Sequence, residues 1–332
     1  MVIIMEKCAF ILPYFGKFPN YFSLFLKSCA ANKTYNWLIF TDDYTDYSYP
    51  ENVVVHYMTF QDMQQYVQSK FDFPIALSAP YKLCDFRPAY GYIFEEYLSE
   101  FAFWGHCDCD LIWGNLDHFL SDPLQQNYDK LFYLGHCTIY RNNKENNCRF
   151  MSSLHGTRRY QEVFSHTHGY TFDESYLPGN INDIFEELGV TIFGADYSGN
   201  IERKNSDFRL TRYDSDLKSF ISEKRQDGLY VWENGTIYRY TMRFHELIKG
   251  EVMYLHFQNR PMKMMSEVLE SRSFKITPNR FEELDVESIT FENYTSIKAK
   301  HINAQRLRIL KTDMLFWRNK IIKKLKRGKR SV

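Results

Sequence analysis

The chain has 332 residues, which suffice for one large α/β domain with extensions or for two average domains. Hydrophobic residues make up 44% and charged residues 25%, a composition that excludes an intrinsically disordered chain. The net charge of zero hides an asymmetry, because residues 301–332 hold eleven Lys or Arg and only Asp313 as an acid, which puts a basic tail on an acidic body.

The first predicted elements alternate between strands and helices. The apolar runs 8–16 and 36–43 and the β-branched run 52–58 are typical of strands, and residues 21–32 have helical periodicity. Residues 78–100 follow as one or two helices. This order of elements predicts an α/β sheet with several parallel strands.

Residues 101–116 predict the next strand, and Asp108 and Asp110 lie near its carboxyl end. Ligands of open α/β sheets bind at this edge. An Asp-x-Asp pair points both carboxylates to one side of the pleat, where they repel each other unless a cation lies between them. The pair therefore indicates a site for Mg²⁺ or Mn²⁺, with two acids of a solvated loop as the alternative.

A third candidate ligand comes late in the chain. The apolar run 252–257 delivers His256, and Arg260 and Lys263 follow within seven residues. Imidazole is an acceptable ligand for Mn²⁺, and Arg or Lys suits phosphate oxygens. A strand-end histidine that is hydrogen-bonded in the core is the alternative interpretation.

The middle of the chain offers a second acidic pair. Residues 133–143 predict a strand that runs into a loop, and Asp173 and Glu174 precede a glycine turn and a short helix. The alternative is that these acids only stabilise the amino end of that helix. Farther on, Asn234-Gly235 between two β-prone runs predicts a hairpin.

The window 81–116 resembles the nucleotide-sugar glycosyltransferases of the GT-A fold. In these enzymes a Lys/Arg-x-x-Asp-x-Arg-like helix precedes a strand that ends in a DxD metal motif, and this chain has "YKLCDFRPAYG" followed by "FWGHCDCDLIWG". Together with the late "LHFQ", these motifs also resemble a family of uncharacterised bacterial proteins of polysaccharide gene clusters. The resemblance covers roughly residues 7–265 and implies a GT-A-like, mixed and mostly parallel sheet flanked by helices, with a C-terminal helical extension.

The resemblance also implies roles for the candidate metal ligands. Asp110 would be the main ligand of Mn²⁺ or Mg²⁺, and Asp108 would contact the donor ribose and support the metal. His256 would complete the coordination shell, and Arg260 and Lys263 would contact the diphosphate. The metal would stabilise the leaving nucleoside diphosphate.

The amino-terminal strands are expected to hold the nucleoside of a nucleotide sugar. Tyr14 and Phe15 end the first strand and are candidates for stacking on a base. Asp42, with Asp43 beside it, ends the second strand and is a candidate to accept a hydrogen bond from the base or ribose; a simple turn is the alternative.

Three residues of the helical segment are further candidates for binding the nucleotide sugar: Lys82, Asp85 and Arg87. The competing interpretation is a structural ion pair. For Asp173 and Glu174 the resemblance implies a place against the donor sugar or the acceptor. Either acid is then the base of an inverting enzyme or orients sugar hydroxyls in a retaining one.

The tail combines an apolar stripe with many cations. Residues 302–327 predict a helix whose apolar positions lie three and four apart, which suits the surface of an anionic membrane. Packing on the body and nucleic-acid binding are the alternatives. Because the body is acidic and shows no matching module, we expect no nucleic-acid partner.

We divide the chain into a catalytic domain, residues 1–265, with a nucleotide-binding half to residue 120 and a sugar and acceptor half from 121, and an extension, 266–332. Seven cysteines, an odd number without a CxxC pair, predict thiols in a reducing compartment. With no signal peptide or membrane span expected, we predict a cytoplasmic protein that contacts the inner face of the cell membrane.

The predicted function is that of a hexosyltransferase. It would transfer a sugar from a nucleotide-sugar donor, a UDP-sugar, to a glycan or lipid-linked glycan acceptor in the synthesis of bacterial capsule, O-antigen or another surface polysaccharide. A sugar nucleotidyltransferase is one alternative, although the chain shows no glycine-rich, basic phosphate loop near its start. A non-catalytic carbohydrate-binding protein is the other, and metal-dependent nucleotide binding would distinguish it.

Overall fold

The computed structural model describes residues 6–202, 208–223 and 228–298, and beyond them 307, 310, 311, 314, 315, 317 and 318. Its main sheet has seven strands, which in chain order are β1 (Glu6–Tyr14), β2 (Tyr35–Thr41), β3 (Val53–Tyr57), β4 (Phe101–Cys107), β6 (Lys130–Leu131), β7 (Cys137–Arg141) and β8 (Ile192–Phe193). Their spatial order is β3-β2-β1-β4-β7-β6-β8.

Six of these seven strands run in one direction. β1 pairs in parallel with β2 and β4, β2 with β3, and β6 with β8, whereas β7 is antiparallel to both β4 and β6. The mixed, mostly parallel sheet predicted from the sequence is therefore confirmed. The predicted order of strand, helix, strand and strand at the start of the chain is confirmed as well.

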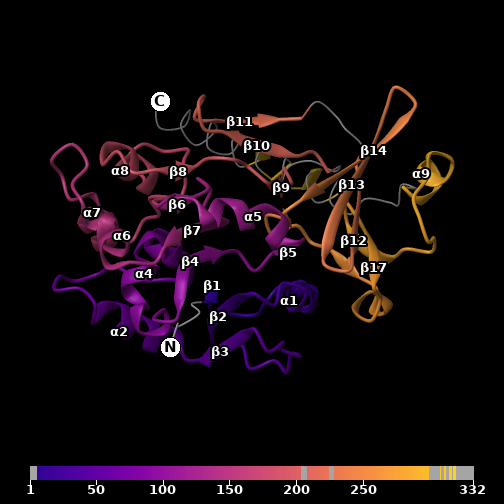
Figure 1. The fold of residues 1–332 in the computed structure, drawn as a ribbon. Coiled ribbons are helices and arrows are strands. Elements are labelled where there is room, and N and C mark those ends of the chain that lie inside the picture. Colours follow the sequence, from indigo (N-terminus) through magenta and orange to yellow (C-terminus); the bar gives the residue numbers. More distant parts are fainter. Residues whose placement is uncertain are drawn as a thin grey trace, which may run out of the picture.

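Helices cover both faces of this sheet (Figure 1). Alternating side chains of the strands divide between two cores: Ile11 and Trp104 belong to one, and Phe10 and Phe103 belong to the other. The helical elements around them are α1 (Phe22–Ala30), α2 (Phe60–Gln68), α5 (Leu116–Gln125), α6 (Lys144–Cys148), η4 (Arg149–Met151), α7 (Arg159–Ser165) and α8 (Ile181–Glu187).

The segment predicted as one or two helices is a run of short turns. It contains η1 (Pro80–Lys82), α3 (Leu83–Phe86), η2 (Arg87–Ala89), α4 (Tyr90–Ile93) and η3 (Glu95–Tyr97). Pro88 explains part of the interruption, because it lacks an N–H and disfavours helical geometry in the residue before it.

A second, six-stranded sheet follows in the chain and lies at the right of Figure 1. Its strands are β12 (Leu229–Glu233), β13 (Thr236–Arg243), β14 (Glu246–Val252), β16 (Lys263–Met264), β17 (Ser273–Thr277) and β18 (Arg280–Glu283), with η5 (Ser266–Leu269) between them and α9 (Phe291–Ile297) after them. The hairpin predicted at Asn234-Gly235 is confirmed, with φ angles of 48° and 89°. The sheet takes in residues on both sides of position 265, so the division predicted there stays a prediction.

Two small sheets complete the described part of the chain. The three-stranded sheet has the order β5 (Leu111–Trp113), β15 (Tyr254–His256) and β9 (Ser198–Asn200), and it joins the end of the first sheet's central strand to the second half of the chain. The two-stranded sheet is a hairpin of β10 (Thr211–Asp214) and β11 (Ser219–Ser222).

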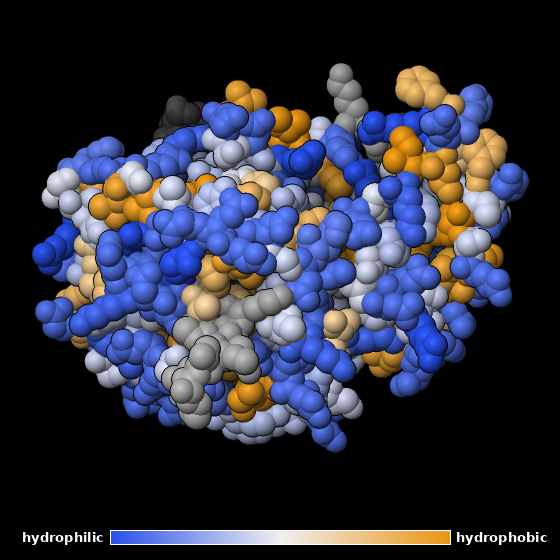
Figure 2. Space-filling model, in the orientation of Figure 1, coloured by the Kyte–Doolittle hydropathy of each residue, from blue (hydrophilic) through white to orange (hydrophobic). Residues whose placement is uncertain are grey.

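On the face shown in Figure 2, hydrophilic residues cover most of the surface, and apolar residues occur in separate groups. Within the described part of the chain, no helix combines the length and the apolarity that a membrane crossing requires. Most of the predicted helix 302–327 lies outside the described residues. Those that are described within it are helical, and Leu307, Leu310, Met314, Leu315 and Trp317 are exposed.

Candidate metal and sugar-nucleotide site

The Asp-x-Asp motif lies at the carboxyl end of β4, the middle strand of the main sheet. Asp108 and Asp110 come directly after the buried residues of this strand, and β5 begins at Leu111. The single strand predicted over 101–116 is thus two strands, with the acids at the break between them. Asp110 is buried, and Asp108 is partly exposed.

His256 reaches the motif through backbone pairing. β15 runs antiparallel to β5, with His256 opposite Leu111, the residue that follows Asp110. On its other side β15 runs parallel to β9, with His256 opposite Asn200. Two strand pairings of three residues each therefore fix the position of His256 beside the acids.

The three side chains form what we call the Asp108–Asp110–His256 cluster. His256 Nε2 lies 3.3 Å from Asp108 Oδ2 and 3.4 Å from Asp110 Oδ1. One potential ligand atom from each residue lies within 4.8 Å of the other two. Asn200 Oδ1 lies 3.1 Å from His256 Nδ1, so Nδ1–H donates to the amide and Nε2 is left to face the carboxylates.

The charges of the cluster are strongly coupled. Burial alone would lower the pKa of His256, but the carboxylates of Asp110 and Asp108 outweigh it and raise the pKa to about 10. Burial likewise opposes ionisation of Asp108, yet Arg87 and His256 hold the pKa of that carboxyl well below its usual range. Two carboxylates this close demand positive charge between them, which a protonated imidazole or a divalent cation supplies.

Arg87 links the cluster to the second acidic pair. Its Nη2 donates to Asp108 Oδ1, and its Nη1 donates to Asp173 Oδ2 and to the carbonyl oxygen of Gly135, both at 2.9 Å. The structure thus brings Asp173, and Glu174 beside it in the chain, to the same site as the Asp-x-Asp motif.

The acidic pair is packed tightly and is hard to ionise. Burial is the largest cause of the raised pKa of Asp173, about 6, although Arg87 opposes it. Burial and the charge of Asp173 raise the pKa of Glu174 to about 8. A Cβ atom at Gly135 would lie 2.8 Å from Glu174 Oε1 and closer still to Asp173, so only glycine leaves room for both carboxylates.

The candidate nucleoside residues lie at the ends of the first two strands. Tyr14 ends β1 and stacks on Phe18, and burial with the nearby Cys109 and Asp110 raises the pKa of its hydroxyl to about 12. Because β1 pairs in register with β4, with Ile11 opposite His106, Tyr14 ends its strand at the same edge of the sheet as the cluster. Phe15 packs edge-on against Phe60.

Asp42 is exposed at the end of β2, and its Oδ1 accepts a hydrogen bond from the Gly16 N–H at 2.7 Å. The hydrogen bond joins the ends of β1 and β2. Its contact with a base or ribose stays a prediction.

Lys82 and Asp85 form a buried ion pair that serves the scaffold. Lys82 Nζ lies 2.8 Å from Asp85 Oδ2 and also donates to the carbonyl oxygens of Val163 and His168. Asp85 in addition accepts from the N–H groups of Tyr170 and Phe172, so the pair fixes the loop that leads to Asp173. Neither side chain has a described contact with the cluster, and their nucleotide-binding role stays a prediction.

No contact described for the two cations after His256 leads to the cluster. Arg260 is only 1% exposed; its Nη1 donates to the Pro278 carbonyl oxygen at 3.0 Å, and its guanidinium lies over the Phe208 ring. Lys263 is exposed on β16. Their predicted contacts with a diphosphate stay predictions.

Four residues around the cluster had no signal in the sequence. Asn200 orients His256, and the Asn259 N–H donates to Asp110 Oδ2. His136 stacks on the His256 ring, with ring centroids 4.4 Å apart, and its Nδ1 lies 2.8 Å from the Tyr254 hydroxyl. None of these residues was assigned a role from the sequence, because strand pairing between distant segments brings the cluster together.

A cavity of about 910 Å³ lies apart from the cluster, and its lining includes none of Asp108, Asp110 and His256. Its charged side chains pair with one another, as Arg159 does with Glu162. The cavity is therefore not the candidate metal site.

An α/β sheet with two aspartates and a histidine at the carboxyl end of its central strand defines a candidate divalent-metal protein. The chain belongs to a family of unknown function, DUF6625, whose model matches residues 10–285. A comparison with curated proteins found no match.

Among solved structures, the chain is similar to mouse xyloside xylosyltransferase 1, with 8% identity and a TM-score of 0.36 over 59% of this chain and 88% of the other. It is also similar to a galactosyltransferase, LgtC, in complex with donor and acceptor sugar analogues, with 9% identity and a TM-score of 0.32 over 58% and 75% of the two chains. An active-site mutant of LgtC matches with 8% identity and a TM-score of 0.33 over 58% and 74%. These similarities concern the fold alone.

Proposed function

We propose that this protein is a metal-dependent glycosyltransferase that uses a nucleotide-sugar donor, a UDP-sugar, and a glycan acceptor of bacterial surface polysaccharide. The observation that carries the proposal is the Asp108–Asp110–His256 cluster at the carboxyl end of β4. Support comes also from the motifs "KLCDFRPAYG" and "FWGHCDCDLIWG", which resemble those of nucleotide-sugar glycosyltransferases.

The donor set of the cluster suits Mn²⁺ or Mg²⁺. Two carboxylate oxygens and one imidazole nitrogen converge, and oxygen ligands with one imidazole are acceptable to Mn²⁺. Asp108, Asp110 and His256 would hold the ion. When bound, such an ion neutralises charge on the two phosphates of a leaving nucleoside diphosphate.

The protein's own residues supply binding and orientation. Tyr14 and Phe15 at the end of β1 offer a place for the base, and the register of β1 with β4, which puts Ile11 opposite His106, supports this arrangement. Asp173 and Glu174 lie across Arg87 from the cluster, where a donor sugar attached to the diphosphate would extend. They would orient sugar hydroxyls or accept a proton from the acceptor hydroxyl.

The composition of the tail supports the proposal that the acceptor is linked to a lipid and lies at a membrane. The described apolar residues of the tail are helical and exposed, and the sequence around them is strongly basic. Each cation near an anionic surface adds about 1 kcal/mol to binding. Peripheral contact with the inner face of the cell membrane is thus part of the proposal.

Calorimetric binding of UDP and GDP, with and without Mn²⁺, tests the proposal. We expect Mn²⁺-dependent binding of UDP that is lost in Asp110→Asn and weakened in His256→Ala. Asp122→Asn on the exposed surface of α5 is the matched control and keeps binding unchanged. If neither nucleotide binds under any metal condition, the proposal is wrong.

A further inference from the structure

Exposed aromatic side chains lie beside the acidic pair. Tyr81 is 82% exposed, Tyr176 50% and Phe220 38%, and they come from η1, from the loop after Glu174 and from β11. We call these three residues the aromatic rim. A single exposed aromatic residue needs no explanation, but a group of them beside a candidate site indicates a binding surface.

Tyr176 connects the rim to the site. It follows Glu174 by two residues, and its ring centroid lies 6.0 Å from that of Phe220. Burial raises the pKa of its hydroxyl, and the nearby Glu174, Asp173 and Tyr81 add to this shift. Tyr176, and Phe220 through its contact with Tyr176, therefore lie next to the acidic pair.

Tyr81 lies in η1, at the start of the run of short turns that carries Arg87, whose Nη1 donates to Asp173. Cys84, partial burial and the charges of Asp173 and Asp108 raise the pKa of its hydroxyl. The next residue, Lys82, is fixed by its buried ion pair with Asp85, so the backbone that carries Tyr81 is held in place.

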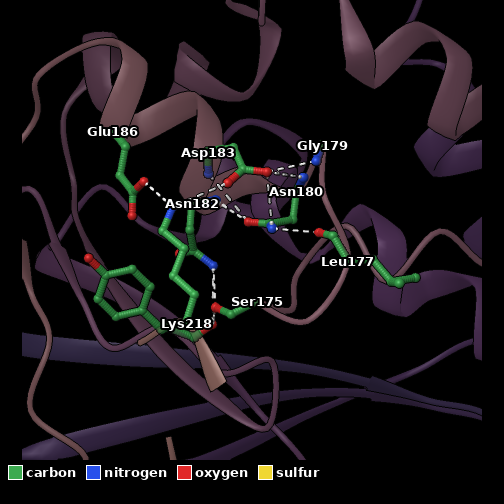
Figure 3. Close-up of polar contacts among 9 residues, drawn as sticks. Ser175, Leu177, Gly179, Asn180, Asn182, Asp183, Glu186 and Lys218 are labelled. Carbon is green, nitrogen blue, oxygen red and sulfur yellow. Dashed lines mark hydrogen bonds and ion pairs between the residues drawn. The ribbon is translucent and has the colours of Figure 1, made fainter. Parts of the chain in front are cut away.

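The hairpin that carries Phe220 is anchored to α8. Lys218 lies in the turn between β10 and β11, and its Nζ is 2.6 Å from Glu186 Oε2 and 3.8 Å from Asp183 Oδ1 (Figure 3). On the opposite strand, Tyr213 packs against Phe220 with ring centroids 5.3 Å apart. The Phe220 ring is thus held from two sides while one part of it stays exposed.

The loop that carries Tyr176 is anchored as well. Ser175 Oγ donates to the Tyr133 carbonyl oxygen at 2.8 Å and accepts from Asn182 Nδ2 at 2.8 Å, as Figure 3 shows for Asn182. Exposed rings on a fixed backbone lose little freedom when a ligand stacks on them.

We propose that the aromatic rim is the acceptor subsite, which binds the terminal sugar residues of a saccharide next to Asp173 and Glu174. This inference rests on the proposed function. A pyranose ring has an apolar C–H face and polar hydroxyl edges, so it needs flat aromatic surfaces and carboxylate acceptors side by side. Tyr176 supplies an exposed ring two residues after Glu174, whose side chain is only partly buried.

A nucleobase is a poorer occupant of the rim. The candidate base-stacking residues Tyr14 and Phe15 lie at and just after the end of β1, and the charge of Asp110 acts on the Tyr14 hydroxyl. The rim lies instead around Asp173 and Glu174, the side where the resemblance places the sugar and the acceptor. A saccharide is therefore the occupant to which we commit.

A glycan array of bacterial oligosaccharides tests the subsite on the full chain, in the presence of UDP and Mn²⁺. We expect glycan binding to fall about tenfold in Tyr176→Ala and Tyr81→Ala, because stacking area is lost. Tyr176→Phe keeps the ring and therefore keeps most of the binding. Phe244→Ala, at a side chain 97% exposed in the β13–β14 turn, is the matched control and stays at the wild-type level.

Calorimetric UDP binding on the same preparations separates the two proposals. If UDP binds but the array signals no glycan, or if both alanine variants bind glycans as the wild type does, the subsite is wrong and the metal site stands. If the wild type binds neither UDP nor glycan, the proposed function is wrong and the subsite with it.

Discussion

The Arg87 guanidinium joins Asp108 of the Asp108–Asp110–His256 cluster to Asp173 of the acidic pair. Because Arg87 and Asp173 are largely buried, removal of the cation leaves carboxylates without a counter-charge. One cation therefore holds the two acidic groups of the site in a single arrangement.

We expect Arg87→Met to lower the free energy of unfolding by about 3–5 kcal/mol, the usual cost of breaking a buried ion pair from one side. Urea denaturation followed by circular dichroism measures this change. Arg158→Met, at an exposed position just before α7, is the control. Equal stability of the two variants would contradict a structural role for the Arg87 bridge.

Asn200→Ala is expected to weaken Mn²⁺ binding by about 10–100-fold, the usual cost of losing the partner that orients a ligating histidine. Asn200 Oδ1 is the acceptor that directs His256 Nε2 toward the carboxylates. Asn200→Asp keeps an acceptor oxygen and should keep more of the affinity. Calorimetric titration with Mn²⁺ measures both variants, and the exposed Asn127→Ala should match the wild type. An unchanged affinity in Asn200→Ala would mean that His256 needs no such partner.

Gly135→Ala should lower the free energy of unfolding by about 1–3 kcal/mol, because the added methyl group would overlap the carboxylates of Asp173 and Glu174. Thermal or urea denaturation measures the loss. Gly250→Ala is a matched control, since a Cβ atom there meets nothing within 4 Å. If the two substitutions cost the same, the space beside Gly135 is larger than the structure indicates.

Asp43 makes stability depend on acid pH. Burial opposes its ionisation, but hydrogen bonds from Lys17, Thr45 and Phe18 outweigh burial and lower its pKa to about 2. The pKa of an unfolded aspartate is near ~3.9, so the folded state favours the ionised form. The stabilisation is therefore complete above about pH 4 and is lost as the pH falls toward 2.

In Asp43→Asn this part of the pH dependence should disappear, and stability at neutral pH should fall by about 1–3 kcal/mol through the weakened hydrogen bonds. Urea midpoints of wild type and variant between pH 2.5 and 6 test both statements. Parallel curves for the two proteins would show that other carboxylates carry the acid sensitivity.

The main sheet could be predicted because its signals are local. Apolar runs such as 8–16 and 36–43, each ended by turn residues, mark buried parallel strands, and the strands lie where these runs are. The Asn234-Gly235 turn was equally clear, since both residues adopt positive φ angles that suit a two-residue hairpin. For residues 78–100 we predicted one or two regular helices. Pro88 interrupts the helical hydrogen bonding there, and the spacing of apolar residues does not reveal such an interruption.

The site could be predicted only in part. Asp108 and Asp110 stand in a recognisable motif, and His256 was found because it ends an apolar run. Asn200 and His136 were missed because each is an ordinary polar residue whose partner lies far away in the chain. Arg260 follows the site closely in the chain, yet its buried guanidinium donates to the Pro278 carbonyl oxygen, so its predicted contact with a diphosphate stays a prediction.

The pairing of β5 with β15 has a consequence for synthesis of the chain. His256 lies opposite Leu111 only after 145 further residues have been made, so a ribosome-bound chain exposes its two aspartates without their third ligand. Such a long closure is costly in chain entropy and late in folding. Metal affinity would then appear only after β5 and β15 have paired. A divalent ion would stabilise the folded protein and would not help to start its folding.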